Sequence, residues 1–228
     1  MKTMLLFDID GTLLLTGGSG KVAFDISFRE LHGIQNAWGD LAPDGKTDPV
    51  IMDELALRTL GRKLSRPESK KLKERYLFHF KREMILAKRF HLLPGVKQLL
   101  KVLGREADFI LGLATGNLEE AAWLKLKRGN IHSHFAFGGF GSDAKDRTKL
   151  TDVALKRGLR HAREKISAKR IFVIGDTPYD IKAGKALGLN TIAVATGSYS
   201  SKALLEHKPH HCLPHLNEPA KFFRLISK

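Results

Sequence analysis

A short apolar strand that ends in two closely spaced carboxylates is the feature that most constrains this chain. Residues 3–7 (Thr-Met-Leu-Leu-Phe) favour a strand, and Asp8-Ile-Asp10-Gly11-Thr12 follows directly. Because residues i and i+2 of an extended chain point to the same side, Asp8 and Asp10 are expected to face one point. Such a pair suits a reaction with one carboxylate as nucleophile and a second as proton carrier. A divalent cation would relieve the repulsion between the two charges.

The arrangement of apolar strand and acid occurs a second time. Residues 171–175 end in glycine and are followed by Asp176, and Asp180 falls in the first turn of a helix predicted to begin near Pro178. A third apolar run, residues 109–114, ends in Thr115-Gly116-Asn117, where a hydroxyl and backbone N–H groups at a helix start suit a phosphate. A surface turn explains one such strand end, but three in one chain favour a functional site.

These motifs, in this order, resemble those of the haloacid dehalogenase superfamily, in the branch of phosphoglycolate phosphatases and β-phosphoglucomutase. The resemblance extends over nearly the whole chain. The matching positions are Asp8, Asp10 and Thr12 for the family's Asp-x-Asp-x-Thr, Thr115 for its Ser or Thr after a second strand, and Gly175, Asp176 and Asp180 for its Gly-Asp-x-x-x-Asp.

The family's third motif, a Lys followed by Pro, is not matched in this chain. Residues 141–150 (Gly-Ser-Asp-Ala-Lys-Asp-Arg-Thr-Lys-Leu) lack proline and offer Lys145, Arg147 and Lys149. A cation is needed because the nucleophile, the acid and the phosphate are all anionic or acidic. We favour Arg147, since Asp146 can cap the following helix so that the next residue points inward, and we place Lys145 second.

The resemblance implies a Mg²⁺-dependent phosphatase that acts on a small phosphorylated metabolite. In that scheme Asp8 attacks phosphorus to form an aspartyl-phosphate, and Asp10 protonates the leaving oxygen and then activates water. Mg²⁺ would be bound by Asp8, the backbone carbonyl of Asp10 and Asp176, with Asp180 ordering the metal-bound water and the loop. The substrate would be held by Thr12, Thr115, Gly116, Asn117 and the third-motif cation.

The order of the elements predicts an α/β fold. Strands near 3–8, 109–114, 135–139, 171–175 and 191–195, with helices between them, indicate a doubly wound, Rossmann-like parallel sheet. About a hundred residues separate the first two strands, which is more than a connection needs, so part of this segment is an insertion. Helices predicted at 21–32, 48–60 and 67–90 indicate an inserted α-helical cap. The expected division is a core of residues 1–16 and 94–228 and a cap of residues 17–93.

Composition predicts a cytoplasmic protein with a surplus of positive charge. The chain has 39 Lys and Arg against 24 Asp and Glu, a net charge of +15, and both predicted parts carry some of it. We therefore expect a solvated basic surface that attracts nucleic acid only nonspecifically. The single Cys212 excludes an intramolecular disulfide and agrees with a reducing compartment. Asp8 interrupts the first apolar run, so we expect no signal peptide or membrane span there.

Two other functions stay open on the sequence. A phosphomutase would use the same core residues and differ in its cap contacts, and the segment Gly45-Lys46-Thr47-Asp48 resembles a cap loop of both groups. A regulatory or polyanion-binding protein with weak catalysis is the third hypothesis, suggested by the basic charge and the irregular third motif. The sequence indicates neither the substrate nor the oligomeric state.

Two weaker patterns are interpreted as structural. Residues 17–21 (Gly-Gly-Ser-Gly-Lys) are faintly similar to a P-loop, but Val22 stands where a P-loop needs Ser or Thr, so we interpret them as a linker. The histidines and cysteine of residues 207–215 fit no standard zinc spacing. We interpret that segment as a short last strand followed by the terminal helix.

Overall fold

A six-stranded parallel sheet forms the centre of the computed structural model, which describes residues 1–226. The neighbouring strands all pair in parallel. This arrangement confirms the predicted α/β fold class, and the last strand and its helix confirm the interpretation of the histidine-rich segment. In spatial order the strands are β5 (Phe137–Gly139), β4 (Phe109–Ala114), β1 (Thr3–Phe7), β6 (Ile171–Gly175), β7 (Asn190–Val194) and β8 (His211–Leu213).

The central position of β1 decides where the functional strand ends meet. All five of its residues are buried, and it pairs with β4 on one side and β6 on the other. Phe7, the last residue of β1, is in register with Leu113 of β4 and Ile174 of β6. The residues that follow these strands therefore leave the same edge of the sheet, which is the usual location of ligand sites in open α/β sheets.

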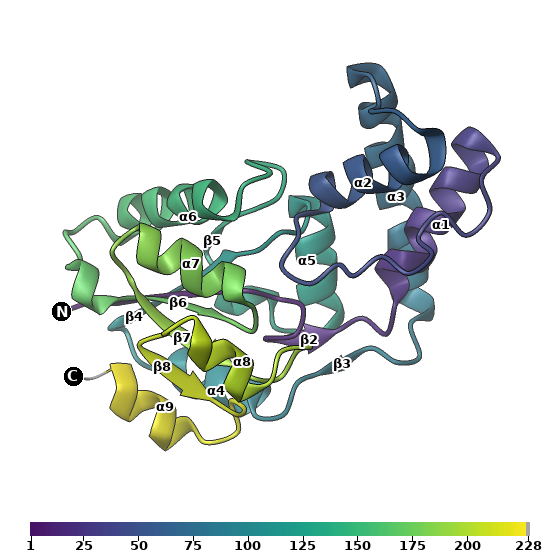
Figure 1. The fold of residues 1–228 in the computed structure, drawn as a ribbon. Coiled ribbons are helices and arrows are strands. Elements are labelled where there is room, and N and C mark those ends of the chain that lie inside the picture. The colour runs from purple at the N-terminus through teal and green to yellow at the C-terminus, as the bar shows by residue number, and fades with distance from the viewer. Residues whose placement is uncertain (227–228) are drawn as a thin grey trace.

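Helices cover both faces of the sheet (Figure 1). Successive side chains of a strand point to opposite faces, so Leu5 and Phe7 pack into one hydrophobic cluster and Met4 and Leu6 into another. The first cluster includes side chains of α4 (Val96–Leu103), α5 (Glu119–Arg128) and α9 (Pro219–Ile226). The opposite face is covered by α6 (Arg147–Ala162), α7 (Pro178–Ala186) and α8 (Ser201–Glu206), and the short 3-10 turns η1 (His132–His134) and η2 (Ala168–Arg170) precede β5 and β6.

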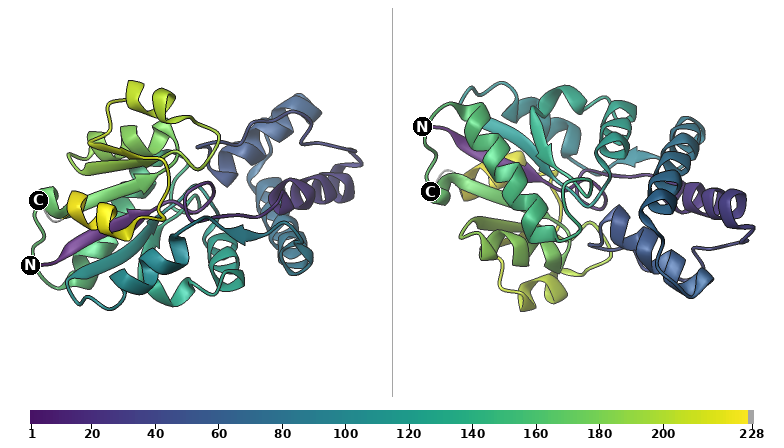
Figure 2. Two further views of the ribbon diagram at one scale, coloured as in Figure 1. Left: turned by 90° about the horizontal axis from the view of Figure 1, so that it is seen from below. Right: turned by 90° about the horizontal axis from the view of Figure 1, so that it is seen from above.

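Three helices inserted after β1 form a second apolar core, which we call the cap. They are α1 (Ser19–His32), α2 (Asp48–Leu60) and α3 (Arg66–Leu86), and they stand apart from the sheet at one end of the molecule (Figures 1 and 2). Phe24 of α1 stacks on Tyr76 of α3 with ring centroids 4.0 Å apart. Tyr76 and Phe80 belong to the helical stripe that the sequence predicts, and both are buried. The exact division at residues 17 and 93 stays a prediction.

The third cap helix ends four residues earlier than predicted. Its last residue is Leu86, and Ala87 has φ −64° and ψ 92°, outside the helical region. The chain then forms β3 (His91–Leu92), which pairs antiparallel with β2 (Leu14–Leu15). Because the incoming and outgoing chains must lie side by side where the cap joins the core, this two-stranded ribbon replaces the last turn of the predicted helix.

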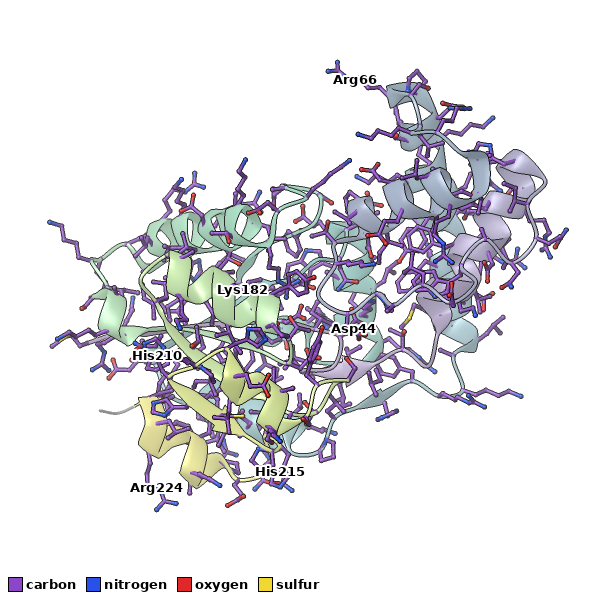
Figure 3. All side chains as sticks on the ribbon, viewed as in Figure 1. Asp44, Arg66, Lys182, His210, His215 and Arg224 are labelled. Atoms are coloured by element: carbon purple, nitrogen blue, oxygen red, sulfur yellow. The ribbon has the colours of Figure 1, made fainter. Side chains whose placement is uncertain are left out.

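Basic side chains lie on both parts of the molecule. Arg66 projects from the start of α3 at the tip of the cap, and Arg224 projects from α9 at the opposite end (Figure 3). Among residues 1–226, the helices are all too short or too polar to cross a membrane.

Candidate active site

A cavity of about 610 Å³ lies between the core and the cap, at the edge where the three strands end. The core contributes polar side chains to this cavity, and the cap contributes aromatic and charged ones. The lining includes Asp8, Asp10, Thr115, Gly116, Asn117, Lys125, Arg147 and Asp176 from the core, and Lys21, Phe24, Trp38, Lys46, Asp48, Ile51 and Tyr76 from the cap.

A buried cluster of three carboxylates lies at the floor of the cavity. Asp8, Asp176 and Asp180 each offer an oxygen within 4.8 Å of the others. Burial raises the pKa of Asp8 to about 6, although the nearby Arg147 opposes this effect. Burial and the charge of Asp8 raise the pKa of Asp176 to about 8. Oxygen ligands at this spacing fit a hard divalent cation, whose charge would offset the cost of burying them ionised.

Within residues 1–226, this cluster is the one group of three or more His, Cys, Asp and Glu side chains that are close enough to share a metal ion. The histidines of residues 207–215 do not belong to it. One of them, His210, accepts a hydrogen bond from the backbone N–H of Thr191 at 3.1 Å. In the P-loop-like segment, Gly17 and Gly18 have left-handed backbone angles and lead into α1, whereas residues 19–21 form the first turn of that helix.

The turn after β1 holds Asp176 in place. Gly11 has φ 77°, and a Cβ at this position would collide with the carboxylate of Asp176. The hydroxyl of Thr12 donates to Oδ1 of Asp176 at 2.9 Å. Thr12 is fully buried and is not among the described residues that line the cavity. Its hydroxyl is thus directed to Asp176 and not to the cavity, and the expectation that Thr12 binds substrate stays a prediction that this geometry does not support.

Of the three third-motif candidates, the structure brings Arg147 to the acid cluster. Asp146 caps α6 by accepting from the N–H of Lys149 at 2.9 Å, as predicted, and Arg147 is buried. Its guanidinium lies 3.0 Å from Oδ1 of Asp8 and 2.5 Å from Oδ1 of Asp180. Burial disfavours its charge, but Asp180 and Asp8 outweigh that effect and raise the pKa of Arg147.

The other two candidates lie elsewhere. Lys145 is exposed and forms an ion pair with Asp53 of α2, so it lies at the seam between core and cap. Lys149 is also exposed, and neither residue is among the described residues that line the cavity. The ammonium of Lys145 contacts the cap and not the acid cluster, so the geometry favours Arg147, and the second choice of Lys145 stays a prediction without support from this arrangement.

Asp180 connects Arg147 to the start of α7. Its Oδ2 accepts from the N–H of Thr177 at 3.1 Å and from the hydroxyl of the same residue at 2.7 Å, which forms a capping box. Its Oδ1 accepts from Arg147. Asp180 thus orders the loop after β6, and this loop also carries Asp176.

The second strand end forms a compact polar turn. The side-chain amide of Asn117 donates to the hydroxyl of Thr115 at 2.7 Å and to Oδ2 of Asp10 at 2.8 Å. Gly116 lies against the cap, because a Cβ there would collide with the backbone carbonyl of Lys46. The structure therefore brings the three predicted residues, Thr115, Gly116 and Asn117, to the cavity beside Asp10.

Two site residues had no assigned role in the sequence. Lys125 of α5 is buried, and its ammonium lies 2.6 Å from Oδ2 of Asp10 and also contacts Asn117. Asp48 of α2 is buried and accepts from the N–H of Leu118 at 2.8 Å. Burial raises the pKa of Asp48 to about 6, and the charge of Lys125 opposes that rise. In the sequence, Lys125 is one of several basic residues of its helix and belongs to no motif. Asp48, in contrast, belongs to the segment of residues 45–48 that resembles a cap loop.

The fold and cavity define a class of α/β enzymes whose acidic site lies under a helical cap. Comparison with known sequences identifies the family: the sequence model of haloacid dehalogenase-like hydrolases matches residues 5–194, and the chain belongs to this family. Phosphoglycolate phosphatase of Vibrio cholerae serotype O1 is 29% identical over 210 residues, which are 90% of each chain. The predicted membership is thereby confirmed, and it supports a phosphatase-type hydrolase.

Solved structures share the whole fold. A hydrolase from Pseudomonas syringae superimposes with a TM-score of 0.71 at 18% identity, and the match covers 100% of both chains. A protein provisionally assigned as a β-phosphoglucomutase from Bacteroides vulgatus has a TM-score of 0.71 at 19% identity, over 99% of this chain and 89% of that one. Both structures therefore have the same overall fold as this chain.

Proposed function

We propose that this protein is a Mg²⁺-dependent phosphatase that hydrolyses a small phosphorylated metabolite through an aspartyl-phosphate on Asp8. The observation that carries the proposal is the pairing of buried Asp8 with cavity-facing Asp10, beside two further carboxylates that fit a metal. Family membership and the relatedness to a phosphoglycolate phosphatase support it independently.

In the first step, a carboxylate oxygen of Asp8 attacks phosphorus and the bond from phosphorus to the leaving oxygen breaks. Asp10 transfers its proton to that oxygen. The side chain of Asp10 is 43% exposed, in contrast to the buried Asp8. Within residues 1–226, Oδ1 of Asp10 has no hydrogen-bond partner, so this oxygen is free to meet the leaving group.

In the second step, water attacks the phosphorus of the aspartyl-phosphate. Asp10, now ionised, accepts the proton of this water, and the bond between phosphorus and the Asp8 oxygen breaks. Phosphate is released and both acids return to their starting states. One residue can serve both steps because it loses its proton in the first and regains one in the second.

The phosphoryl group needs cationic and N–H partners in both steps. The hydroxyl of Thr115, the backbone N–H groups near Gly116 and the guanidinium of Arg147 line the cavity at this place. Mg²⁺ held by Asp8, Asp176, Asp180 and the backbone carbonyl of Asp10 would add charge stabilisation to the same oxygens. Together these groups can offset the negative charge of the attacking carboxylate and the charge that develops on the phosphoryl oxygens.

The cap side of the cavity suits a small organic phosphate. Phe24, Trp38 and Tyr76 are buried and limit its size. Lys21 of α1 also lines the cavity and places a positive charge on the cap side. A compact substrate with a second anionic group would meet the positive charge of Lys21 as well as that of Arg147. Phosphoglycolate, the substrate in the name of the Vibrio relative, is such a compound.

A phosphomutase remains the second candidate, because the same fold occurs in the structure provisionally assigned as a β-phosphoglucomutase. The two activities differ in the acceptor of the phosphoryl group: water in a phosphatase and a second sugar hydroxyl in a mutase. A polyanion-binding role rests on the net charge alone and has no further support in the site.

The proposal is tested by measuring phosphate release from a panel of phosphomonoesters, including phosphoglycolate, hexose phosphates and p-nitrophenyl phosphate, with Mg²⁺ or with a chelator. We expect release that requires the metal and that Asp8→Asn lowers at least about a thousandfold, since the amide is not a nucleophile. Undiminished activity of that variant would overturn the mechanism. Conversion of hexose 1-phosphate to 6-phosphate without phosphate release would favour the mutase.

A further inference from the structure

The two acids after β1 are each paired with a different cation. Asp8 is paired with Arg147 of α6, as described above. Asp10 is paired with Lys125, which comes from α5 on the opposite face of the sheet. The side chain of Lys125 is only 7% exposed, which is rare for a lysine and requires compensation by nearby partners. Its position is therefore specific and not that of a solvated surface lysine.

The ammonium of Lys125 belongs to a closed polar network. It donates to Oδ2 of Asp10 and to the side-chain oxygen of Asn117. The side-chain nitrogen of Asn117 in turn donates to the same Oδ2 at 2.8 Å. Two donors thus hold one oxygen of the Asp10 carboxylate, and this arrangement directs the other oxygen away from them.

The cap completes the surroundings of Lys125. Its ammonium lies 5.6 Å from the ring centroid of Phe80 in α3, within the range of a cation–π contact. The negative charge of Asp48 in α2 is also close enough to interact with it. Lys125 is therefore in contact with Asp10 on one side and with the cap on the other.

We propose that Lys125 is a positioning residue for proton transfer: with Asn117 it holds Oδ2 of Asp10, so that Oδ1 points to the leaving oxygen of the substrate. This inference rests on the proposed phosphatase function. It assigns to Lys125 a role in the step in which the bond to the leaving group breaks. A lysine that only braces the core against the cap would affect substrates with good and poor leaving groups alike.

Leaving-group dependence separates these two roles. An alkyl phosphate needs a proton on its leaving oxygen, whereas p-nitrophenolate leaves readily without one. The value of kcat/KM covers the steps up to phosphoryl transfer to Asp8, so it excludes the later attack by water. We would compare kcat/KM for p-nitrophenyl phosphate with kcat/KM for the alkyl phosphate that the wild-type protein hydrolyses fastest in the panel above.

With Lys125→Met we expect a loss of about 100-fold on the alkyl phosphate and of less than about 10-fold on p-nitrophenyl phosphate, as for loss of general-acid catalysis. Asp10→Asn should show the same selectivity, and the double variant should lose little more than Asp10→Asn alone. The matched control is Lys127→Met, which removes an exposed lysine of the same helix and should leave both values unchanged. If Lys125→Met does not fold, Lys125→Gln, which keeps a shorter and uncharged hydrogen-bond donor, should lose activity selectively on the alkyl phosphate but to a smaller extent.

Equal losses on the two substrates, or no loss, would overturn the role of Lys125 while leaving the phosphatase assignment intact. A wild-type protein that hydrolyses neither substrate would overturn the proposed function, and this inference with it.

Discussion

At the scale of single residues, charge pairing decides what each acid of the first motif can do. Asp8 is buried beside Arg147 and the other carboxylates of the cluster, which suits a nucleophile held in one position. Asp10 lies two residues further on and faces the cavity, and one of its oxygens has no hydrogen-bond partner among the described residues. The same residue type therefore has two environments, and the proposed division into nucleophile and proton carrier follows from them.

Replacing Arg147 tests the assignment of the third-motif cation. Arg147→Ala leaves Asp8 and Asp180 without their shared partner, so we expect kcat/KM to fall about 100-fold to 1,000-fold. It should also lower the free energy of unfolding by about 3–5 kcal/mol, the cost of breaking a buried ion pair. Arg147→Lys keeps the charge but not the two-pronged geometry, and it should lie between the wild type and Arg147→Ala in kcat/KM.

Lys145→Ala is the matched control for that experiment. Its ion pair with Asp53 is exposed, so kcat/KM should change less than about twofold. A larger loss of activity in Lys145→Ala than in Arg147→Ala would show that the catalytic cation had been misassigned.

At the scale of secondary-structure elements, the start of α2 joins the cap to the core. The N–H of Asp48 donates to the carbonyl of Gly116 at 2.8 Å, and its carboxylate accepts from Leu118 at the start of α5. Thr47 adds a hydrogen bond from its hydroxyl to the carbonyl of Lys145 at 3.1 Å. The loop that precedes α2 is thereby held over the phosphate turn.

Removing the Asp48 carboxylate should weaken this junction. We expect Asp48→Ala to lower the free energy of unfolding by about 1–3 kcal/mol, because the N–H of Leu118 loses its buried acceptor. The KM should rise as well, since the loop that lines the cavity is less firmly held. Chemical denaturation and steady-state kinetics measure the two effects.

The matched control is Asp152→Ala, in an exposed i,i+4 pair on α6, which should change the free energy of unfolding by less than about 0.5 kcal/mol. Equal stability of Asp48→Ala and the wild type would contradict the predicted role of this junction.

At the scale of the whole molecule, the insertion of the cap between β1 and β4 creates a cavity with an acidic floor in a basic protein. The net charge of +15 is spread over core and cap and should draw anionic substrates toward the surface. The carboxylates at the cavity floor are brought together by elements far apart in the chain. Folding therefore includes the cost of burying them together, and metal binding can offset that cost.

Metal binding should accordingly stabilise the protein more at alkaline than at acidic pH. Without metal, Asp8 and Asp176 have pKa values raised to about 6 and about 8. Because these folded-state values exceed the unfolded ones, their contribution to stability is complete below the unfolded pKa and is lost as pH rises through the range from 6 to 8. Mg²⁺ competes with these protons, so its stabilising effect should grow over the same range.

Thermal unfolding with Mg²⁺ and with a chelator, at about pH 5.5 and about pH 8, measures this difference. At a concentration about 100-fold above Kd we expect about 2.7 kcal/mol of stabilisation at the higher pH, or roughly 5–10 °C in Tm. At the lower pH the shift should be clearly smaller. Asp176→Asn should remove most of it, and a larger shift at acidic pH would refute the linkage.

Local sequence patterns were sufficient to predict the sheet, the cap and most of the polar residues around the cavity. Apolar runs that end in acids or in Thr115-Gly116-Asn117 mark strand ends, and the parallel pairing of strands brings such ends to one edge. Arg147 could be favoured because Asp146 is the capping residue before it. The cap fixes where the helix begins, and so which side of the helix Arg147 occupies. The length of α3 was overestimated, since the pairing of β3 with β2 involves residues far away in the sequence.

The partners of Thr12, Lys145 and Lys125 were decided by the tertiary structure alone. Thr12 occupies a motif position, but its hydroxyl donates to Asp176. Lys145 contacts the cap because Asp53 lies opposite it at the interface between core and cap. Lys125 is one lysine among several in its helix, and only the packing of α5 between sheet and cap buries it beside Asp10. A sequence determines which elements form because their periodicity is local, whereas the charges that meet in a site depend on contacts between segments more than a hundred residues apart.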